Sequence, residues 1–323
     1  FKRYYLLTIN HANKRSYNLK KIIFLSFIFL LFCTGCQNNP PISFIDFSKT
    51  TPITKNTTNN NDTKPLKIAV ATVLSPNVTI SNYRNIAKYI SEKTNRPTLL
   101  IQRKTYEELN ILMSNGEADI AFMSTGAYSS YRGLNEIELL AMVAYKKTAT
   151  YFSQVIVHKD SSISTLADLQ GKTFAFTDPL SYSGHIAILN ELHQSHNKPE
   201  TFFSRYIYTY GHDKSIWAVA NKVVDAASID SMILEHSQKY TPWITANIKV
   251  ISSIGPYPTG PVVIRKSLPP EIKTSLKTSL LNMHEDSANM ETLNGLLIDR
   301  FIEPNPEAYL PLIKNYQQVG DNI

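Results

Sequence analysis

The feature that most constrains the fold of this chain is a repeated alternation of strand-like and helix-like segments. Residues 66–71 form a short apolar run suited to a buried parallel strand, and residues 80–94 then place apolar side chains at helical spacing. The order repeats with a strand at 99–101, a helix opened by the capping-box pattern Thr105-x-x-Glu108, and a strand at 119–122. This alternation predicts a largely parallel sheet with helices on both faces.

A second alternating series follows the first and predicts a second α/β unit. It comprises strands at 151–157, 172–176 and 226–229, a helical turn at 166–169, and helices at 183–194, 212–221 and 230–238. A chain of 323 residues with an apolar fraction of 43% is long enough and apolar enough for two such units.

The C-terminal part of the chain is expected to return to the first unit. One more strand is predicted at 261–264, and the helices at 269–283 and 306–319 have no strands of their own. We expect these helices to pack on the first lobe, so the chain crosses between the lobes twice, near 149–153 and near 255–261. The predicted lobes are therefore 66–150 with 264–323 for lobe 1, and 151–263 for lobe 2.

The first 35 residues have the order of a secretory signal. Lys20-Lys21 precede an apolar run at 22–32, which is too short to span a bilayer as a helix. Cys36 follows Thr34-Gly35 and resembles the acylated Cys of a bacterial lipobox, although Cys33 stands where that pattern usually has Leu. We expect a lipoprotein signal peptide at 1–35 and lipidation of Cys36; the alternative is an ordinary signal peptide and a soluble periplasmic product.

Residues 36–65 are rich in Asn, Thr, Ser and Pro and predict a flexible tether between the anchor and the folded lobes. The formal net charge of +7 does not indicate a nucleic-acid partner, because six basic and no acidic residues lie in 1–35 and only about +1 remains for the rest. Cys33 and Cys36 are the only cysteines, so the cleaved chain can form neither an intramolecular disulfide nor a Cys-based metal site. No cofactor is expected.

The candidate binding residues follow the ends of predicted strands, where open α/β sheets bind their ligands. Ser181-Tyr182-Ser183-Gly184 lies between a strand and a helix, and free N–H groups and hydroxyls at a helix start can bind an anion. The simpler alternative is that a Ser of this loop only caps the helix. Ser124 and Thr125 follow another strand and can supply hydroxyl and N–H donors from the opposite lobe.

Two further polar residues stand at predicted helix starts. His212 can donate a hydrogen bond to an anion or simply fill its loop, and Asp230 can cap its helix or accept from a ligand. No Walker loop, Gly-x-Gly-x-x-Gly, His-Glu-x-x-His or Gly-x-Ser-x-Gly motif occurs. A hydrolase centre built from Ser181 or Ser183 with His185 or His212 is a weak alternative, since no spacing fixes a nucleophile and a base.

Two segments resemble a known family. Residues 178–184 resemble the Asp-Pro-x-Ser-x-Ser-Gly loop of the phosphate/phosphite/phosphonate-binding proteins of ABC importers, and residues 211–226 resemble their Gly-His-(Asp/Glu) segment that ends in Val-Asp-Ala. The similarity extends from about residue 66 to about residue 270. It implies a two-lobed α/β fold of the type II periplasmic-binding-protein class, which closes over its ligand and presents it to a membrane permease.

The resemblance also implies roles for individual residues. Ser181, Ser183 and Gly184 correspond to oxyanion donors and His212 to a further donor, with Tyr182 inside the same loop. Tyr106 and Tyr151 match positions of ligand-facing tyrosines.

The chain departs from the family where aminoalkylphosphonate binders carry acids. Met232 and Gly260 stand at those positions, so an ammonium group would lose its carboxylate partners. Asp230 can accept only from a protonated oxygen, which favours a hydrogen phosphate or phosphonate and disfavours fully ionised sulfate. We expect phosphate, phosphite or methylphosphonate to bind better than aminoethylphosphonate.

The sequence thus predicts an extracytoplasmic, membrane-anchored solute-binding lipoprotein without catalytic activity. Its expected partners are a small phosphorus oxyanion and the permease and ATPase subunits of an ABC importer, and the protein is expected to be a monomer. The alternatives are a receptor for another small anion and a sensory or accessory lipoprotein with the same fold.

Overall fold

The computed structural model describes residues 64–71 and 76–320, and within these the side chains of residues 76–78 and 318–320 are not described. The predicted signal peptide at 1–35, the lipidation site Cys36 and nearly all of the tether at 36–65 lie outside the described residues. Two sheets and their flanking helices make up the described part.

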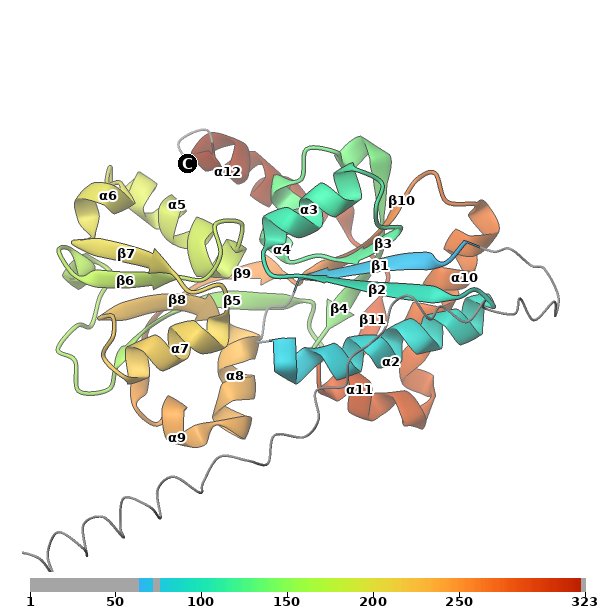
Figure 1. The fold of residues 1–323 in the computed structure, drawn as a ribbon. Coiled ribbons are helices and arrows are strands. Elements are labelled where there is room, and N and C mark those ends of the chain that lie inside the picture. Colours follow the sequence, from blue (N-terminus) through green and yellow to red (C-terminus); the bar gives the residue numbers. More distant parts are fainter. Residues whose placement is uncertain (1–63, 72–75, 321–323) are drawn as a thin grey trace, which may run out of the picture. The chain divides into compact units, whose positions relative to one another are not determined.

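The first sheet has six strands in the order β11-β4-β10-β3-β1-β2 (Figure 1). Strand β1 pairs in parallel with β2 and β3, whereas β3, β10, β4 and β11 are joined by antiparallel pairings. The bounds are β1 Leu66–Ala71, β2 Thr98–Arg103, β3 Ile120–Phe122, β4 Ile137–Ala144, β10 Pro261–Arg265 and β11 Arg300–Ile302.

The second sheet has five strands in the order β7-β6-β8-β5-β9. Strand β6 pairs in parallel with β7 and β8, and β5 pairs antiparallel with β8 and β9. The bounds are β5 Thr150–His158, β6 Thr173–Phe176, β7 Arg205–Tyr208, β8 Ala226–Asp230 and β9 Ile248–Pro258. The expected two-lobed α/β fold is confirmed, and each sheet is mixed because antiparallel strands extend its parallel part.

Helices cover both faces of each sheet (Figure 1). Those of lobe 1 are α2 (Pro76–Thr94), α3 (Tyr106–Ser114), α4 (Thr125–Ser130), α10 (Pro270–Leu281) and α11 (Met290–Asn294). Those of lobe 2 are a π-helix (Tyr182–Ile186), α5 (Ala187–Gln194), α6 (Pro199–Phe202), α7 (His212–Ala220), α8 (Ser231–Tyr240) and α9 (Pro242–Thr245). The capping box predicted at the start of α3 is confirmed: the Thr105 side chain accepts from Glu108 N–H, and the Glu108 side chain accepts from Thr105 N–H.

The chain passes between the sheets at two places. The turn 145–149 joins β4 to β5, and Thr259-Gly260 joins β9 to β10. Because β10 pairs with β3 and β4, residues 261–263 belong to the first sheet and not to lobe 2 as predicted from the sequence. The final helix α12 (Leu310–Gly320) contacts both α4 and α5, so it bridges the lobes instead of packing on lobe 1 alone.

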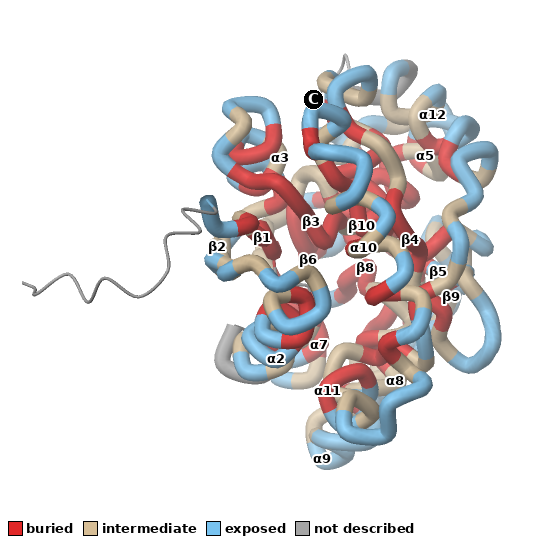
Figure 2. The backbone as a smooth tube through the Cα atoms, turned by 90° about the vertical axis from the view of Figure 1, so that its right-hand side faces the viewer, coloured by how far each residue is buried: buried red, intermediate tan, exposed pale blue. Residues whose placement is uncertain are grey.

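The hydrophobic core follows the sheets. Figure 2 shows the buried backbone concentrated along the strands and on the helix sides that face them. In lobe 1, Ile86 and Ile90 of α2 are fully buried against Ile68 and Val70 of β1. Full burial of an Ile side chain contributes roughly 1.5–3 kcal/mol before the entropic cost of ordering it. These contacts fix the strand ends from which the loops of the site emerge.

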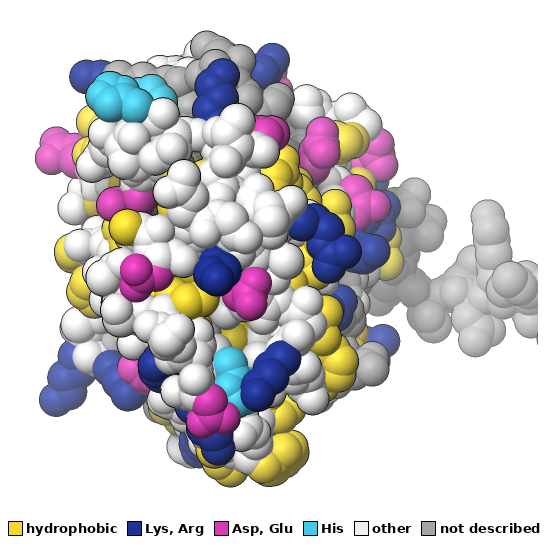
Figure 3. Space-filling model, turned by 90° about the vertical axis from the view of Figure 1, so that its left-hand side faces the viewer, with side chains coloured by type: hydrophobic (Ala, Val, Ile, Leu, Met, Phe, Trp, Pro, Cys, Tyr) yellow, Lys and Arg dark blue, Asp and Glu magenta, His cyan; other side chains and the backbone are white. Residues whose placement is uncertain are grey.

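The surface is mixed in charge. On the face drawn in Figure 3, Lys and Arg side chains are interspersed with Asp and Glu, with no continuous basic patch on that face. Among the described residues, no helix is both long enough and apolar enough to cross a membrane.

Candidate functional site

A cavity of about 130 Å³ lies between the two sheets. It is lined by nine of the ten ligand-binding residues predicted from the sequence: Tyr106, Ser124, Thr125, Tyr151, Ser181, Tyr182, Ser183, His212 and Asp230. Gly184 does not line it. The lining residues come from both lobes and cluster where strands end and helices begin.

The oxyanion loop of lobe 2 follows β6 and enters the π-helix at Tyr182. Ser181 is the N-cap, and its Oγ accepts the N–H of Gly184 at 3.0 Å. The N–H groups of Tyr182 and Ser183 donate to no other described group, so they are available to an anion at the helix start. The N–H of Gly184, which the sequence predicts as a further oxyanion donor, is bound by the Ser181 hydroxyl in this structure.

Two buried serines fix the position of this helix start. Ser153 Oγ donates to the Ser183 carbonyl at 2.7 Å, and Ser228 Oγ donates to the same oxygen. Both serines are fully buried within strands of the second sheet. These bonds anchor the backbone at the start of the π-helix before any ligand arrives, which lowers the cost of ordering it on binding.

His212 is buried at the start of α7 and is held in one tautomer. Its Nδ1 accepts the backbone N–H of Asp230 at 3.0 Å, and burial lowers its pKa to about 3. A neutral imidazole whose Nδ1 is an acceptor carries its proton on Nε2. His212 therefore presents a neutral N–H donor.

Asp230 is the N-cap of α8, which was one of the two roles expected from the sequence. Its Oδ1 accepts the N–H of Met232 at 2.7 Å and that of Ile233 at 3.4 Å, and its Oδ2 accepts none from the described residues. Burial raises the pKa of Asp230 to about 7. Near neutral pH this carboxyl can share a single proton with an oxyanion, either by donating its own or by accepting one from the ligand.

Three tyrosines, Tyr106, Tyr151 and Tyr182, also line the cavity; together with the serines, Thr125, His212 and Asp230 they form what we call its polar half. Burial raises the pKa of Tyr106 and Tyr151 above the ordinary value, so both phenols stay protonated. Tyr151 lines the cavity together with Thr125 and Ser183, which belong to opposite lobes. The phenol of Tyr182 instead accepts from Asn315 of α12 at 3.3 Å, so its hydroxyl points to the helix and not to a ligand.

Ser124 and Thr125 form the lobe 1 side of the polar half, at the start of α4. Ser124 Oγ accepts the N–H of Ala127 at 3.1 Å, which leaves its own proton for the cavity. The hydroxyl of Thr125 donates to the Pro258 carbonyl at 2.7 Å, so only its backbone N–H remains as a donor. The arrangement is one of neutral donors aimed at a common space, which suits a small oxyanion.

Comparison with known proteins agrees with this geometry. The family described as ABC transporter, phosphonate, periplasmic substrate-binding protein matches residues 68–309. The chain belongs to this family. The Phosphonates-binding periplasmic protein of Escherichia coli (strain K12) is 32% identical over 189 residues, a stretch that covers 56% of this chain and 56% of that protein. The chain thus spans little more than half the length of this curated relative.

Solved structures show the same fold. A binding protein component of an ABC phosphonate transporter from Pseudomonas aeruginosa superposes with a TM-score of 0.73 at 23% identity, covering 80% of this chain and 87% of that one. PhnD1 from Prochlorococcus marinus (MIT 9301), solved in complex with methylphosphonate, gives a TM-score of 0.73 at 17% identity over 80% of this chain and 98% of that one.

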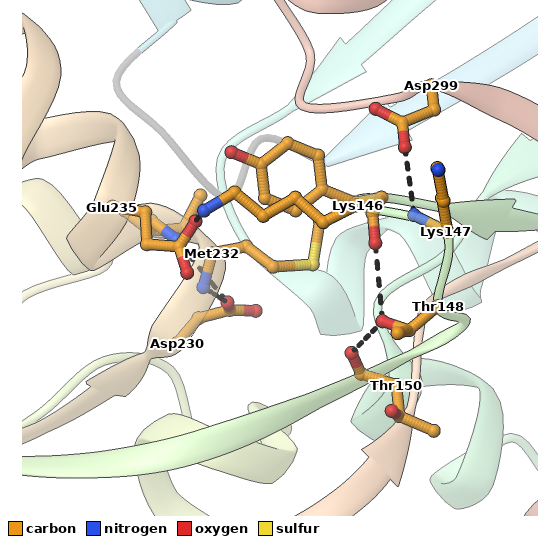
Figure 4. Close-up of polar contacts among 10 residues, drawn as sticks. Lys146, Lys147, Thr148, Thr150, Asp230, Met232, Glu235 and Asp299 are labelled. Carbon is orange, nitrogen blue, oxygen red and sulfur yellow. Dashed lines mark hydrogen bonds and ion pairs between the residues drawn. The ribbon is translucent and has the colours of Figure 1, made fainter.

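The two lobes of this chain touch at more than one place. At one place, the N–H of Tyr106 donates to Asp178 Oδ2 at 3.3 Å, and Lys104 Nζ lies 5.1 Å from the ring centre of Tyr210. At another, Lys146 Nζ pairs with Glu235 Oε2 at 2.5 Å (Figure 4). In this structure the two lobes are therefore in direct contact. Asp178 was part of the recognised motif, but its bridging role was not predicted.

The hydrolase alternative is not supported by the positions of the histidines. His185 bonds the Pro179 carbonyl at 2.7 Å through Nδ1 and the Tyr208 hydroxyl at 3.0 Å through Nε2, and it does not line the cavity. The Nδ1 of His212 is occupied by a backbone N–H. Within the described residues, neither ring acts as a base toward Ser181 or Ser183.

Met232 and Gly260, where the sequence resemblance expects acids in aminophosphonate binders, both line the cavity. Met232 lies in the first turn of α8 and lines the cavity. At Gly260 a Cβ atom would overlap the carbonyl oxygen of Met123, so the backbone of this crossover leaves no space for an acidic side chain.

Proposed function

We propose that the chain is the extracytoplasmic solute-binding lipoprotein of an ABC importer for a small phosphorus oxyanion: a phosphonate, phosphite or phosphate. In this proposal the oxyanion is clamped in the cavity between the lobes, and the closed protein delivers it to the permease and ATPase subunits. The protein has no catalytic step.

The observation that carries the proposal is the set of neutral donors around one space. The cavity collects the free N–H groups of Tyr182 and Ser183, the Nε2–H of His212 and the phenols of Tyr106 and Tyr151, and its described lining contains no Lys or Arg. Fixed dipoles of this kind bind a desolvated oxyanion without a counter-charge. The related PhnD1 of Prochlorococcus marinus holds methylphosphonate in the same fold.

Asp230 supports a phosphorus oxyanion over a sulfur one. A carboxyl with a pKa of about 7 can share a proton with a hydrogen phosphonate, whereas sulfate carries no proton near neutral pH. Sulfate would meet the ionised carboxyl as a like charge or would need the carboxyl to be protonated. The site should therefore discriminate against sulfate.

Attachment to the membrane is proposed to occur through a lipid on Cys36, with residues 37–65 as the tether. A receptor held near its permease experiences a raised effective concentration, which favours capture by a transporter that binds only the closed form.

A thermal-shift screen tests the proposed function. The folded protein should be stabilised by methylphosphonate, phosphite or phosphate and not by equal concentrations of sulfate, because a ligand that binds only the native state raises the unfolding temperature. Absence of stabilisation by any of the three phosphorus oxyanions would contradict the proposal. Deletion of the gene should also abolish uptake of labelled ligand, whereas a purely sensory lipoprotein would leave uptake in place.

A further inference from the structure

Part of the cavity lining, called the apolar half below, is made of apolar side chains. Its walls include Phe122 and Val143 of lobe 1, Met232 and Ile233 of lobe 2, and Leu296 and Leu297 from the loop between α11 and β11. Phe122 belongs to a core cluster of lobe 1, and Ile233 belongs to one of lobe 2. Two hydrophobic cores therefore open onto the same space.

The loop at Leu296-Leu297 joins these two cores. Leu297 lies in lobe 1 by sequence, but its side chain packs in the lobe 2 cluster that contains Ile233 and borders Met232. Its backbone has a φ of +59°, a conformation that residues other than Gly rarely adopt. Leu296 packs instead on the lobe 1 cluster. The loop thus forms one wall of the apolar half, and its two leucines pack on the cores of different lobes.

Thr79 supplies a polar group in this otherwise apolar region. Its side chain is only 4% exposed and lines the cavity, and its Oγ1 has no hydrogen-bond partner among the described residues. A buried hydroxyl without a partner is uncommon in folded proteins and is a candidate for binding a ligand group. Thr79 lies near the start of the 19-residue helix α2.

The position of α2 places Thr79 at the apolar end of the cavity. Tyr83, one turn after Thr79, packs edge-on against Phe122 with ring centres 5.5 Å apart. Asn85 donates to the Thr292 hydroxyl at 3.0 Å, and a Cβ at Gly295 would meet the side chain of Asn82. The first half of α2 therefore lies against the end of α11, directly before the Leu296-Leu297 loop.

The charged groups near this end are already engaged. Figure 4 shows Met232 beside Lys146, whose ammonium pairs with Glu235. Asp230 is committed through Oδ1 to the cap of α8. An ammonium group among Met232, Thr79 and the Leu296-Leu297 loop would lose water and gain thioether, methyl and hydroxyl neighbours, which is unfavourable for a charge.

We propose that Thr79, Met232 and the Leu296-Leu297 loop form a second subsite, which accepts a short, uncharged organic substituent on the phosphorus atom and hydrogen-bonds a hydroxyl of that substituent through Thr79 Oγ1. This inference rests on the proposed function, because it takes the oxyanion to lie among the donors of the polar half. It makes a hydroxyalkylphosphonate the preferred class of ligand, ahead of inorganic phosphate and of aminoalkylphosphonates.

Calorimetric titration with four probes tests the subsite: phosphate, ethylphosphonate, 2-hydroxyethylphosphonate and 2-aminoethylphosphonate. In the wild-type protein, 2-hydroxyethylphosphonate should bind most tightly and 2-aminoethylphosphonate less tightly than ethylphosphonate. Thr79→Val keeps the shape of the side chain and removes its hydroxyl. It should weaken 2-hydroxyethylphosphonate binding by roughly threefold to tenfold, and the loss for ethylphosphonate should be much smaller.

Two further variants make the outcome decisive. Thr278→Val is the same substitution at an exposed position of α10 and should leave all four affinities unchanged. Met232→Glu places an acid in the first turn of α8, where a negative charge suits the helix dipole, and should shift preference toward 2-aminoethylphosphonate.

Several results overturn the subsite. One is that 2-aminoethylphosphonate or phosphate binds the wild type most tightly. Another is that Thr79→Val weakens the binding of 2-hydroxyethylphosphonate and of ethylphosphonate by the same factor. Each of these would leave the proposed function standing, because phosphorus oxyanions would still bind. If none of the four probes binds, the proposed function and the subsite fail together.

Discussion

The backbone N–H of Asp230 donates to Nδ1 of His212 at 3.0 Å, and this single bond links the start of α8 to the start of α7. It fixes the proton of the neutral imidazole on Nε2, since burial keeps the ring uncharged. The two residues that the sequence placed at separate helix starts therefore act together: one orients the other as a donor.

Removal of either predicted donor should weaken oxyanion binding. We expect His212→Ala to cost on the order of 1.5–3 kcal/mol in calorimetric titration with methylphosphonate, because it deletes a hydrogen bond to a charged ligand, and Ser183→Ala to cost less, because it removes the hydroxyl and keeps the backbone N–H. Ser204→Ala, at an exposed position of the same lobe, is the matched control and should bind normally. Unchanged affinity in both site variants would remove these side chains from the site.

The raised pKa of Asp230 predicts a specific pH dependence of the ligand-free protein. A carboxyl that titrates at about 7 when folded and near 4 when unfolded binds more protons in the folded state across that window, so its contribution to stability is lost as pH rises from about 4 to 7. His212, whose folded pKa is lowered to about 3, acts in the opposite direction below about pH 6.5.

The variant Asp230→Asn separates the two effects and keeps a good N-cap residue on α8. The difference in free energy of unfolding, variant minus wild type, should rise with pH by up to about 1.4 kcal/mol per unit between pH 4 and 7 and then level off. Denaturant unfolding at a series of pH values measures it. A difference that stays constant across this range would show that Asp230 titrates normally.

Gly126 should be needed for closure of the lobes. A Cβ at this position would overlap the carbonyl oxygen of Leu180 in lobe 2, so Gly126→Ala should disfavour the closed arrangement and leave an open one possible. Overpacking of this kind costs roughly 1–3 kcal/mol, and affinity should fall by a similar free energy. Small-angle scattering should show ligand-induced compaction in the wild type only. Normal compaction in Gly126→Ala would place the closing contact elsewhere.

The lipid anchor can be tested independently of the binding site. Metabolic labelling with a fatty-acid probe should mark the wild-type protein and not Cys36→Ala, since Cys36 is the expected acylated residue. Equal labelling of both proteins would show that Cys36 is not the acylated residue. Loss of label with unchanged ligand binding is the expected result.

Much of the polar half of the site could be predicted from the sequence. Ser181, Ser183, His212 and Asp230 follow strand ends within recognisable segments, and the geometry of parallel strands brings such positions to one edge. The hydrogen-bond partner of each individual donor could not be predicted. Whether the N–H of Gly184 faces a ligand or the Ser181 hydroxyl depends on the turn geometry of a π-helix, which no spacing in the sequence specifies.

The apolar half was not identified from the sequence for a different reason. Thr79 lies one residue before the helix predicted at 80–94, and Leu297 lies in a loop that follows no recognised motif. Their position at the cavity follows from how α2 packs against α11, a contact between segments about 200 residues apart in the chain. Strand β9 was missed because its Lys and Ser residues, typical of an edge strand, interrupt the apolar pattern on which the strand prediction relied.

The central claim is that neutral donors and Asp230 together clamp a protonated phosphorus oxyanion between the lobes. Side-by-side calorimetric titration of methylphosphonate and sulfate at neutral pH tests it most directly, in the wild type and in Asp230→Asn. We predict that sulfate binds the wild type at least roughly tenfold more weakly, and that the gap narrows in Asp230→Asn, because an amide can donate to a fully ionised oxygen. Sulfate binding as tightly as methylphosphonate, or a gap unchanged by the substitution, would contradict the account.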